Sequence, residues 1–305
     1  MIDILKSSIE CCIAFDNKKL YFYRGIFAFT TENISGYIKN FHLKDKSLLT
    51  VGSSADQVIN AALHGCKDIT LYDIIPEAKY YYYLKVAGLL SLTKDEFLEF
   101  FRFKNYNNSL ENPNVFNMKS FNKIKVLLKS LSNEAYLYYD ELFKNFSNIT
   151  IRKALFSPCE YNTDRIILFN DYLKSDILYE EASSKIKKIN PKFICDDILE
   201  IDNKDTYDNI WLSNIATWLR SEKEIDKLLT KSYECLNERG RLLLSYLYTT
   251  TSKLEYDPSF APIYDINTIL KKYKDYNLSL IEFDGVKSDS THIEEQKDSI
   301  LLLKK

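Results

Sequence analysis

The sequence lacks the residue patterns that mark several large protein classes. It has three histidines, and none of its six cysteines forms a C-x-x-C pair, so we expect no metal site. No apolar run approaches the roughly 20 residues that a membrane-spanning helix needs, so we expect no transmembrane segment. Lys and Arg number 41 against 43 Asp and Glu, which leaves no basic excess for nucleic-acid binding. The first residues carry Asp3 and Glu10 without a long apolar core, which argues against a signal peptide.

Glycine is also scarce, with 7 residues in 305. There is neither a G-x-G-x-x-G fingerprint nor a G-x-x-x-x-G-K-[ST] loop, so a dinucleotide enzyme and a P-loop nucleotide hydrolase are disfavoured. Hydrophobic residues make up 46% and charged residues 28%, which is ordinary for one large or two modest globular domains. Cys66, Cys195 and Cys235 lie in or near apolar segments, so we expect buried, reduced thiols in a cytoplasmic protein.

What is present is an alternation of short apolar runs and helical patterns. The strands are expected at residues 46–52, 68–73, 192–197, 208–213, 241–248, 278–283 and 299–303. Helices are expected after 56, from Pro76 to about 90, and at 94–103, 120–131, 133–146, 165–178, 222–237 and 266–273. This alternation predicts a Rossmann-like, three-layer α/β sheet of seven strands, with an antiparallel pair at its end.

The second and third expected strands are separated by roughly 120 residues, whereas a crossover needs about a dozen. We therefore predict a large helical insertion at 90–181, which could cover a ligand or could be a purely structural extension. The expected domains are an N-terminal arm or lid at 1–45, a Rossmann-like domain at 46–89 and 182–305, and the insertion.

Polar residues follow the first two strands. Gly52 lets a ligand approach the backbone, and the next helix offers free N–H groups. Asp73 ends the second strand, where a carboxylate can accept hydrogen bonds from both hydroxyls of a ribose. A helix N-cap is the alternative role for Asp73.

Polar residues also follow the third and fourth strands. Asp196 and Asp197 stand where a side chain or backbone group can read an adenine amino group, or where they cap a short turn. Ser213 and Asn214 open from the fourth strand, with Trp218 one helical turn later. This is where transferred groups lie in such sheets, although a plain turn would also explain the pair.

The order of these features along the chain resembles that of the S-adenosylmethionine-dependent transferases of the class I methyltransferase fold. The features are a loop at Gly52, the single acid Asp73, the acidic pair at 196–197 and the polar pair at 213–214. The resemblance covers 47–305 without the insertion. A closer one is to the 3-amino-3-carboxypropyl transferases that start betaine-lipid synthesis. Asp56-Gln57 stands for their Asp-Asn and 73–76 (DIIP) for their Asp-x-Asn-Pro, while 212–219 (LSNIATWL) is similar to their Leu-Ser-Asn-Ile-x-x-Trp segment. The chain departs from that pattern at Ala55, Gln57 and Ile75.

The resemblance implies S-adenosylmethionine as the cofactor. The cofactor-binding residues it implies are Gly52, Ser53, Ser54, Asp56, Gln57, Asp73, Ile74, Asp196, Asp197, Ile198, Ser213, Asn214 and Trp218. The candidate catalytic residues are Asp197, Ser213, Asn214, Tyr23 and Glu32, of which Asp197, Tyr23 and Glu32 could deprotonate an acceptor.

The reaction expected from the resemblance is transfer of the aminocarboxypropyl group to a small-molecule, amino-acid or lipid acceptor. Two alternatives stay open: methyl transfer, and a non-catalytic module that binds the cofactor or a partner. The run Tyr80–Tyr83 is expected to be mostly core. Neither the acceptor nor the oligomeric state follows from the sequence.

Overall fold

The computed structural model divides the chain into two compact units. The helical unit comprises Met1–Thr31, Gly52–Leu63 and Asp73–Lys188, and the sheet unit comprises Glu32–Val51, His64–Tyr72 and Ile189–Lys305. Residues described by the structure are 2–18, 26–104, 110–200, 205–219, 221–245, 270–274, 276–283 and 298–305.

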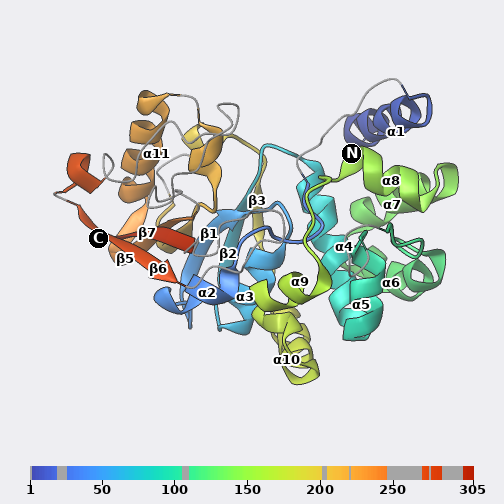
Figure 1. The fold of residues 1–305 in the computed structure, drawn as a ribbon, viewed down its shortest axis with the longest axis horizontal. Helices are drawn as coiled ribbons and strands as arrows, with labels where there is room; N and C mark the ends of the chain where they lie inside the picture. The colour runs from blue at the N-terminus through green and yellow to red at the C-terminus, as the bar shows by residue number, and fades with distance from the viewer. Residues whose placement is uncertain are drawn as a thin grey trace. The chain divides into compact units, whose positions relative to one another are not determined.

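The sheet unit is built on one seven-stranded sheet (Figure 1), in the order β3-β2-β1-β4-β5-β7-β6. The strands are β1 (Ser47–Val51), β2 (Asp68–Tyr72), β3 (Lys192–Ile194), β4 (Tyr207–Trp211), β5 (Leu236–Ser245), β6 (Asn277–Phe283) and β7 (Asp298–Lys304). The first five strands pair in parallel, and β7 runs antiparallel to both β5 and β6. This is the strand order of the class I methyltransferase fold, so the predicted fold class is confirmed.

An apolar core holds the helix α11 (Glu222–Glu234) to this sheet. Ser221 and Glu224 form a capping box at the start of α11, which satisfies two of its free N–H groups. Ile225, Leu228 and Leu229 recur at helical spacing and face the sheet residues of the core. Short helices of this unit among the described residues are α2 (Ile34–Tyr37), η1 (Ile38–Asn40), η3 (Ile198–Glu200) and η4 (Ile215–Trp218), and residues 270–272 are also helical.

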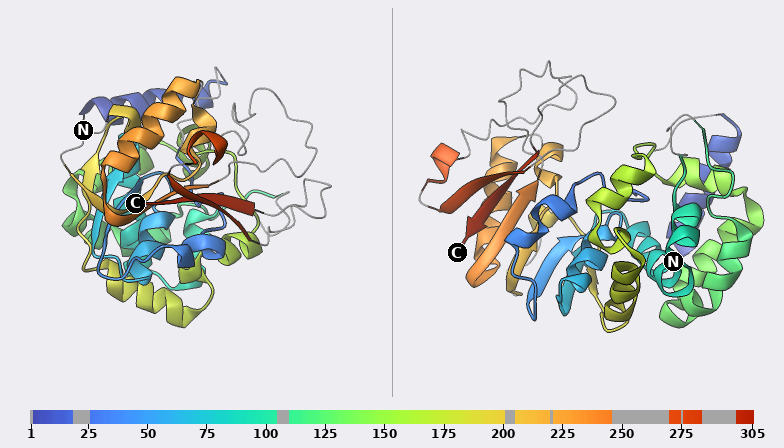
Figure 2. Two further views of the ribbon diagram at one scale, coloured as in Figure 1. Left: turned by 90° about the vertical axis from the view of Figure 1, so that its left-hand side faces the viewer. Right: turned by 60° about the horizontal axis from the view of Figure 1, so that its bottom comes forward.

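The helical unit is formed by helices of 3 to 15 residues (Figure 2). Six of its described helices begin at a polar residue whose side chain accepts a backbone N–H. Its helices are α1 (Ile2–Asp16), α3 (Asp56–Leu63), α4 (Glu77–Ser91), α5 (Lys94–Phe101), α6 (Met118–Leu131), α7 (Asn133–Asn145), α8 (Asn148–Leu155), α9 (Thr163–Phe169), η2 (Asp171–Leu173) and α10 (Asp176–Ile186). The N-cap side chains that accept a backbone N–H are Thr93, Asn117, Ser132, Ser147, Asn162 and Ser175. Each such cap contributes about 0.5–2 kcal/mol, so the sequence fixes these boundaries locally.

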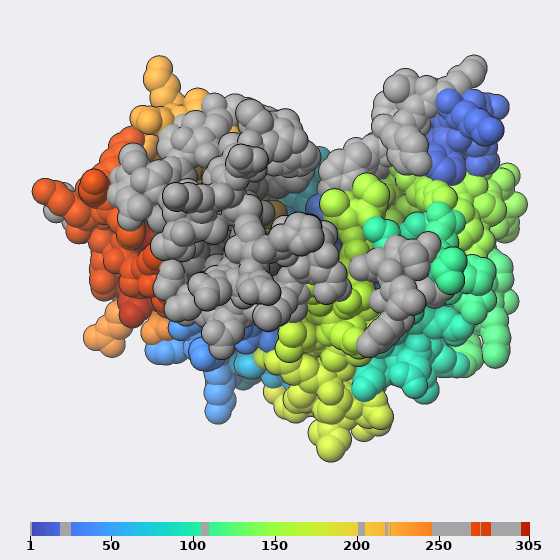
Figure 3. Space-filling model, viewed as in Figure 1, coloured from blue at the N-terminus to red at the C-terminus, as the bar shows by residue number. Residues whose placement is uncertain are grey.

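Helix α4 is the centre of the helical unit. It packs against α5, α6, α7 and α10, and Tyr80, Tyr81 and Tyr82 are at most 3% exposed. The expectation that the tyrosine run is mostly core is therefore confirmed. Gly88 allows α5 to approach closely, because a Cβ there would lie 2.6 Å from Cε2 of Phe101. On the outside of the unit, α10 is at the surface and appears in yellow-green at the lower edge of Figure 3.

Several predicted boundaries differ from the structure. The helix predicted at 165–178 is three pieces, because the Asn170 side chain bonds the Ile166 carbonyl and Ser175 starts a new helix. The predicted helix 222–237 ends at Glu234, and β5 already begins at Leu236 and runs through Gly240. Residues 246–248 of the predicted strand and 266–269 of the predicted helix lie outside the described residues.

The buried-thiol prediction is right for Cys66 and Cys235 and wrong for Cys195, which is exposed because it lies just beyond the short strand β3. Among the described residues, no helix combines the length and the apolar character that crossing a membrane requires. The same residues contain no cluster of His, Cys, Asp or Glu arranged to hold a metal ion.

Candidate functional site

The first group of predicted site residues lies in the helical unit, where Asp73 meets the loop that begins at Gly52. The Ser53 N–H donates to Oδ2 of Asp73 at 2.8 Å, and the Ile75 N–H donates to Oδ1 at 2.9 Å. A Cβ on Gly52 would lie 3.3 Å from Asp73 Oδ2, so a side chain there would crowd the carboxylate. Burial raises the pKa of Asp73 to about 6, an effect that the two N–H donors partly oppose.

The residue after Asp73 has a large apolar side chain that is exposed to solvent. Ile74 is 69% exposed, next to a carboxylate whose oxygens each accept one backbone hydrogen bond. A carboxylate has about four acceptor positions, so both oxygens of Asp73 retain capacity for further donors. An acceptor pair beside an open apolar side chain can bind a group with adjacent hydroxyls and a flat apolar ring.

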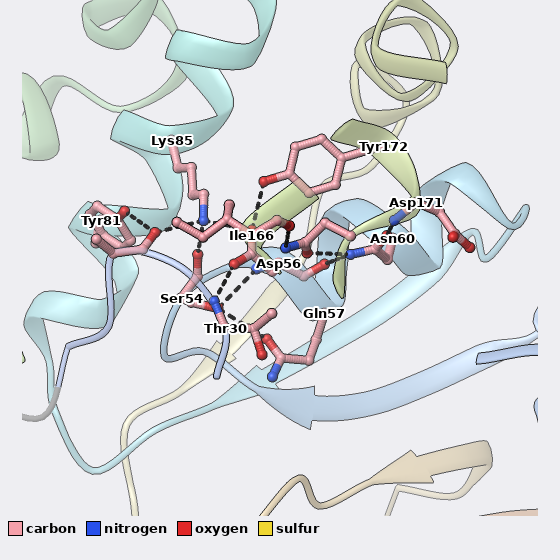
Figure 4. Close-up of polar contacts among 12 residues, drawn as sticks. Thr30, Ser54, Asp56, Gln57, Asn60, Tyr81, Lys85, Ile166, Asp171 and Tyr172 are labelled. Carbon is pink, nitrogen blue, oxygen red and sulfur yellow. Dashed lines mark hydrogen bonds and ion pairs between the residues drawn. The ribbon is translucent and has the colours of Figure 1, made fainter. Parts of the chain in front are cut away.

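The second group in this unit is a buried cluster centred on Asp56, the first residue of α3 (Figure 4). Oδ1 of Asp56 receives Lys85 Nζ at 2.6 Å and the Tyr172 hydroxyl at 2.7 Å, and Oδ2 receives the Thr30 N–H at 2.6 Å. Lys85 also donates to the Ser54 and Ala28 carbonyls, each at 2.8 Å. Both side chains of the Lys85–Asp56 ion pair are 0% exposed. We call these residues the Asp56 cluster.

Neighbouring amides extend the cluster along the other side of α3. Asn60 donates to Oδ1 of Asn170 at 2.9 Å and accepts the Asp171 N–H at 2.9 Å (Figure 4). The segment Asn170–Tyr172 is thereby fixed to the helix that follows the Gly52 loop. Ser54 and Gln57 are also buried, and the Ser54 hydroxyl donates to Oε1 of Gln57 at 3.3 Å.

The structure thus separates the predicted loop residues into two roles. Gly52, Ser53, Asp73 and Ile74 lie together at the ends of the loop and of β2. Ser54, Asp56 and Gln57 point into the interior, where their side chains hold the loop in place (Figure 4). Ala55, between them, has a left-handed backbone with φ of 63°, a strained conformation for a residue other than glycine.

In the sheet unit, the predicted residues Glu32, Ser213 and Asn214 come together just after β4. The Ser213 hydroxyl donates to Oε1 of Glu32, and the Asn214 N–H also donates to this carboxylate. Ser213 adopts a left-handed backbone with φ of 56°, and its carbonyl accepts the Ser245 N–H from the end of β5 at 3.0 Å. The sharp turn after β4 is therefore held from both sides.

Two aromatic residues complete the surroundings of Glu32. The Tyr37 hydroxyl donates to Oε2 of Glu32 at 2.5 Å, and the Trp211 indole N–H donates to the Tyr37 oxygen at 3.1 Å. Glu32 is 2% exposed, and burial raises its pKa, while hydrogen bonds from Ser213, Tyr37 and Asn214 oppose this rise. Because Glu32 is enclosed, it can influence a reacting group only through the residues it orients.

Of the remaining residues predicted from the sequence, those whose side chains are described belong to neither of the two clusters around Asp56 and Glu32. Asp196 and Asp197 are exposed; Asp196 accepts the Asp197 N–H at 2.8 Å, and Asp197 accepts the Leu199 N–H at 2.9 Å, which is the turn-capping alternative. Ile198 is 7% exposed and its side chain belongs to the sheet core. Trp218 ends η4, and Tyr23 lies outside the described residues.

Lys85 and Tyr172 are the important residues that the sequence reasoning missed. Lys85 had a recognisable signal, because it is a single charge inside the apolar helix segment 84–90 (LKVAGLL). A lysine in such a position needs a buried carboxylate, and burial lowers the pKa of Lys85 to about 8 even beside Asp56. Tyr172 carried no comparable signal, because it is one of 23 tyrosines.

Comparison with known proteins finds similarity only at the level of three-dimensional structure. No protein-family model and no curated protein matches the chain. Among solved structures, the N-methyltransferase NodS from Bradyrhizobium japonicum WM9, in complex with S-adenosyl-L-homocysteine, matches with a TM-score of 0.41 and 10% identity, over 86% of this chain and 78% of that one.

Two further solved structures are similar. The ribosomal protein L11 methylase from Lactobacillus delbrueckii subsp. bulgaricus has a TM-score of 0.38 and 10% identity, over 88% of this chain and 74% of that one. An rRNA methylase from Streptococcus thermophilus has a TM-score of 0.35 and 9% identity, over 86% of this chain and 89% of that one. All three scores are below 0.5, so the fold assignment rests on the strand order described above.

Proposed function

We propose that the protein is an S-adenosylmethionine-dependent transferase. The observation that carries this proposal is the pairing of Asp73 with the Gly52 loop, beside the exposed Ile74. In sheets of this kind, ligands bind at the carboxyl ends of the parallel strands, and Gly52 and Asp73 are the residues that directly follow β1 and β2.

The residues present fit the cofactor's nucleoside. Asp73 would accept hydrogen bonds from the two ribose hydroxyls. Each of its oxygens accepts one backbone N–H and therefore keeps an acceptor position for a hydroxyl. Ile74 would cover one face of the adenine, which gives an otherwise exposed apolar side chain a partner. The exposed Asp196 and Asp197 follow β3 and remain our candidates for the adenine amino group.

When bound, the cofactor would supply a sulfonium whose neighbouring carbons are open to attack by a nucleophile. The protein's residues would then orient the acceptor and the methionine-derived side chain of the cofactor. We assign this to Ser213 and Asn214, whose turn is held by Glu32 and by the Ser245 N–H. Glu32 is in this proposal a positioning residue. The exposed Asp197 has a second candidate role, which is to accept the acceptor's proton, and this would leave the adenine contact to Asp196.

A pH dependence of cofactor binding is expected from Asp73. Its pKa is about 6, so lowering the pH from 7.5 to 5 protonates about nine in ten of these carboxylates in the free protein. A protonated carboxyl accepts fewer hydrogen bonds, so affinity for S-adenosylhomocysteine should fall about tenfold over this range. Isothermal titration calorimetry at pH 5, 6 and 7.5 measures it, with Asp73→Ala as the variant that should lose the dependence. A flat profile in the wild type would contradict the assignment of Asp73 to the ribose.

Asn214→Ala should lower kcat more than it lowers cofactor affinity. The backbone of Asn214 is fixed by its N–H bond to Glu32, so removing the side chain leaves the turn intact. Turnover of S-adenosylmethionine and calorimetric binding of S-adenosylhomocysteine give the two quantities. Equal losses in both would mean that Asn214 serves the turn alone.

For the group transferred, we propose 3-amino-3-carboxypropyl, with a small-molecule, amino-acid or lipid acceptor. The similarity of 212–219 to the betaine-lipid enzymes supports it. Methyl transfer is the second candidate, because the strand order is that of the methyltransferase fold.

Mass spectrometry after incubation with S-adenosylmethionine and a cell extract containing lipids separates the two. Methylthioadenosine above the enzyme-free control indicates aminocarboxypropyl transfer, and S-adenosylhomocysteine indicates methyl transfer. Cofactor binding without either product would instead support a binding module.

A further inference from the structure

One buried cation of the helical unit lacks the carboxylate that the others have. Arg165, on α9, is 8% exposed, and no Asp or Glu among the described residues forms an ion pair with it. Its Nη2 is buried and has no hydrogen-bond partner in the described part of the chain. The guanidinium lies 5.3 Å from the centre of the Tyr161 ring, which is a weak substitute for a counter-ion.

The other enclosed cations of the same unit show how the chain treats a structural charge. Lys85 is paired with Asp56 at 2.6 Å, and Arg152, 1% exposed, is paired with Glu160 at 3.3 Å and donates to the Ser157 carbonyl at 2.9 Å. Charged groups removed from water are costly unless they are paired. Among the described residues, Arg165 departs from this rule, and an unpaired buried guanidinium is suited to a ligand that carries a negative charge.

The position of Arg165 connects it to the candidate cofactor loop. The helix α9 begins at the Asn162 cap, and the residues that follow it, Asn170 and Asp171, are hydrogen-bonded to Asn60 of α3. Asn60 also donates to the Asp56 carbonyl at 2.9 Å. Arg165 therefore stands on a segment that is fixed to the helix directly after the Gly52 loop.

We propose that Arg165 binds the carboxylate of a bound small molecule. A guanidinium presents a planar fork of N–H donors that matches a carboxylate with two parallel hydrogen bonds. This inference rests on the proposed function. That function supplies two possible sources of the carboxylate: the amino-acid end of the cofactor and an amino-acid acceptor. Arg165 would thereby select ligands that carry this group.

The test compares Arg165→Met with Arg152→Met, a control variant at a buried arginine that has a carboxylate partner. Without ligand, Arg165→Met should have a melting temperature equal to or above the wild type, because an uncompensated buried charge is removed. Arg152→Met should melt lower, because it leaves Glu160 without its cation. A drop in Arg165→Met similar to that in Arg152→Met would overturn the proposal, since it would show a structural role.

Ligand binding then identifies the source of the carboxylate. If it is the cofactor, Arg165→Met should bind S-adenosylhomocysteine at least tenfold more weakly and methylthioadenosine, which lacks the amino-acid end, as well as the wild type does. If it is the acceptor, both nucleosides should bind unchanged, while succinate should raise the melting temperature of the wild type and not of Arg165→Met.

Arg165→Lys, which keeps the charge without the fork, should retain part of whichever effect is found. The proposal is overturned if Arg165→Met and the wild type respond alike to all three ligands. A wild type that binds neither nucleoside would refute the proposed function, and the succinate comparison would still decide the role of Arg165.

Discussion

Replacing Lys85 with methionine is expected to lower the free energy of unfolding by about 3–5 kcal/mol, because it leaves the enclosed Asp56 carboxylate without its cation. The loss should be large because Asp56 has no exposure to water that could solvate it. Urea denaturation followed by circular dichroism measures the difference.

Lys79→Met is the matched control on the same helix. Lys79 has a side chain 42% exposed, and its ion pair with the exposed Glu134 is 3.9 Å long, so its loss should change stability by about 0.5 kcal/mol or less. In the double variant Lys85→Met with Asp56→Asn, part of the lost stability should return, because the unpaired charge is gone. If Lys85→Met were as stable as Lys79→Met, the Asp56 cluster would not be what fixes the loop.

Replacing Asp73 with alanine is expected to weaken binding of S-adenosylhomocysteine by more than tenfold. The change removes the proposed ribose acceptor and also the acceptor of the Ser53 and Ile75 N–H groups, so the loop ends lose their connection. Isothermal titration calorimetry at pH 7.5, where the wild-type carboxylate is ionised, gives the affinity.

Asp68→Ala provides the comparison, since Asp68 is exposed at the opposite end of the same strand. Its affinity should equal that of the wild type. Unchanged affinity in Asp73→Ala would remove Asp73 from the site, and similar losses in both variants would point to damage to β2 instead of to a ligand contact.

The sheet could be predicted from the sequence because its signals are local. Strands β1, β2 and β4 are short, mostly apolar runs, each followed within two residues by a small or polar residue, such as Gly52 after β1 or Ser213 after β4. The break within 165–178 was harder to predict, because besides its local contacts the Asn170 side chain accepts a hydrogen bond from Asn60, 110 residues earlier. A pattern read along one segment holds no information about such a partner.

In the candidate site, too, local sequence signals mark some residues, and contacts between distant residues decide what they do. Residue types at strand ends drew attention to Asp73 and Ser213, and the polar-aromatic stretch before β1 drew attention to Glu32. The sequence could not distinguish a carboxylate proposed to bind a ligand from one that holds the loop. Asp73 and Asp56 look alike in sequence, and the presence of Lys85 and Tyr172 around Asp56 separates them. Their roles depend on contacts that form only when distant helices pack.

The Asp56 cluster also has a consequence for how the chain is made. Asp56 and Tyr172 are 116 residues apart, and at about 5–20 residues per second the ribosome adds the tyrosine about 6–23 s after the aspartate. During this interval the loop after β1 is synthesised but lacks one of the groups that fix it. A fragment that ends before residue 172 would therefore contain Asp56 and Lys85 in an incomplete cluster, and nascent chains at that stage are the ones we expect to need protection from aggregation.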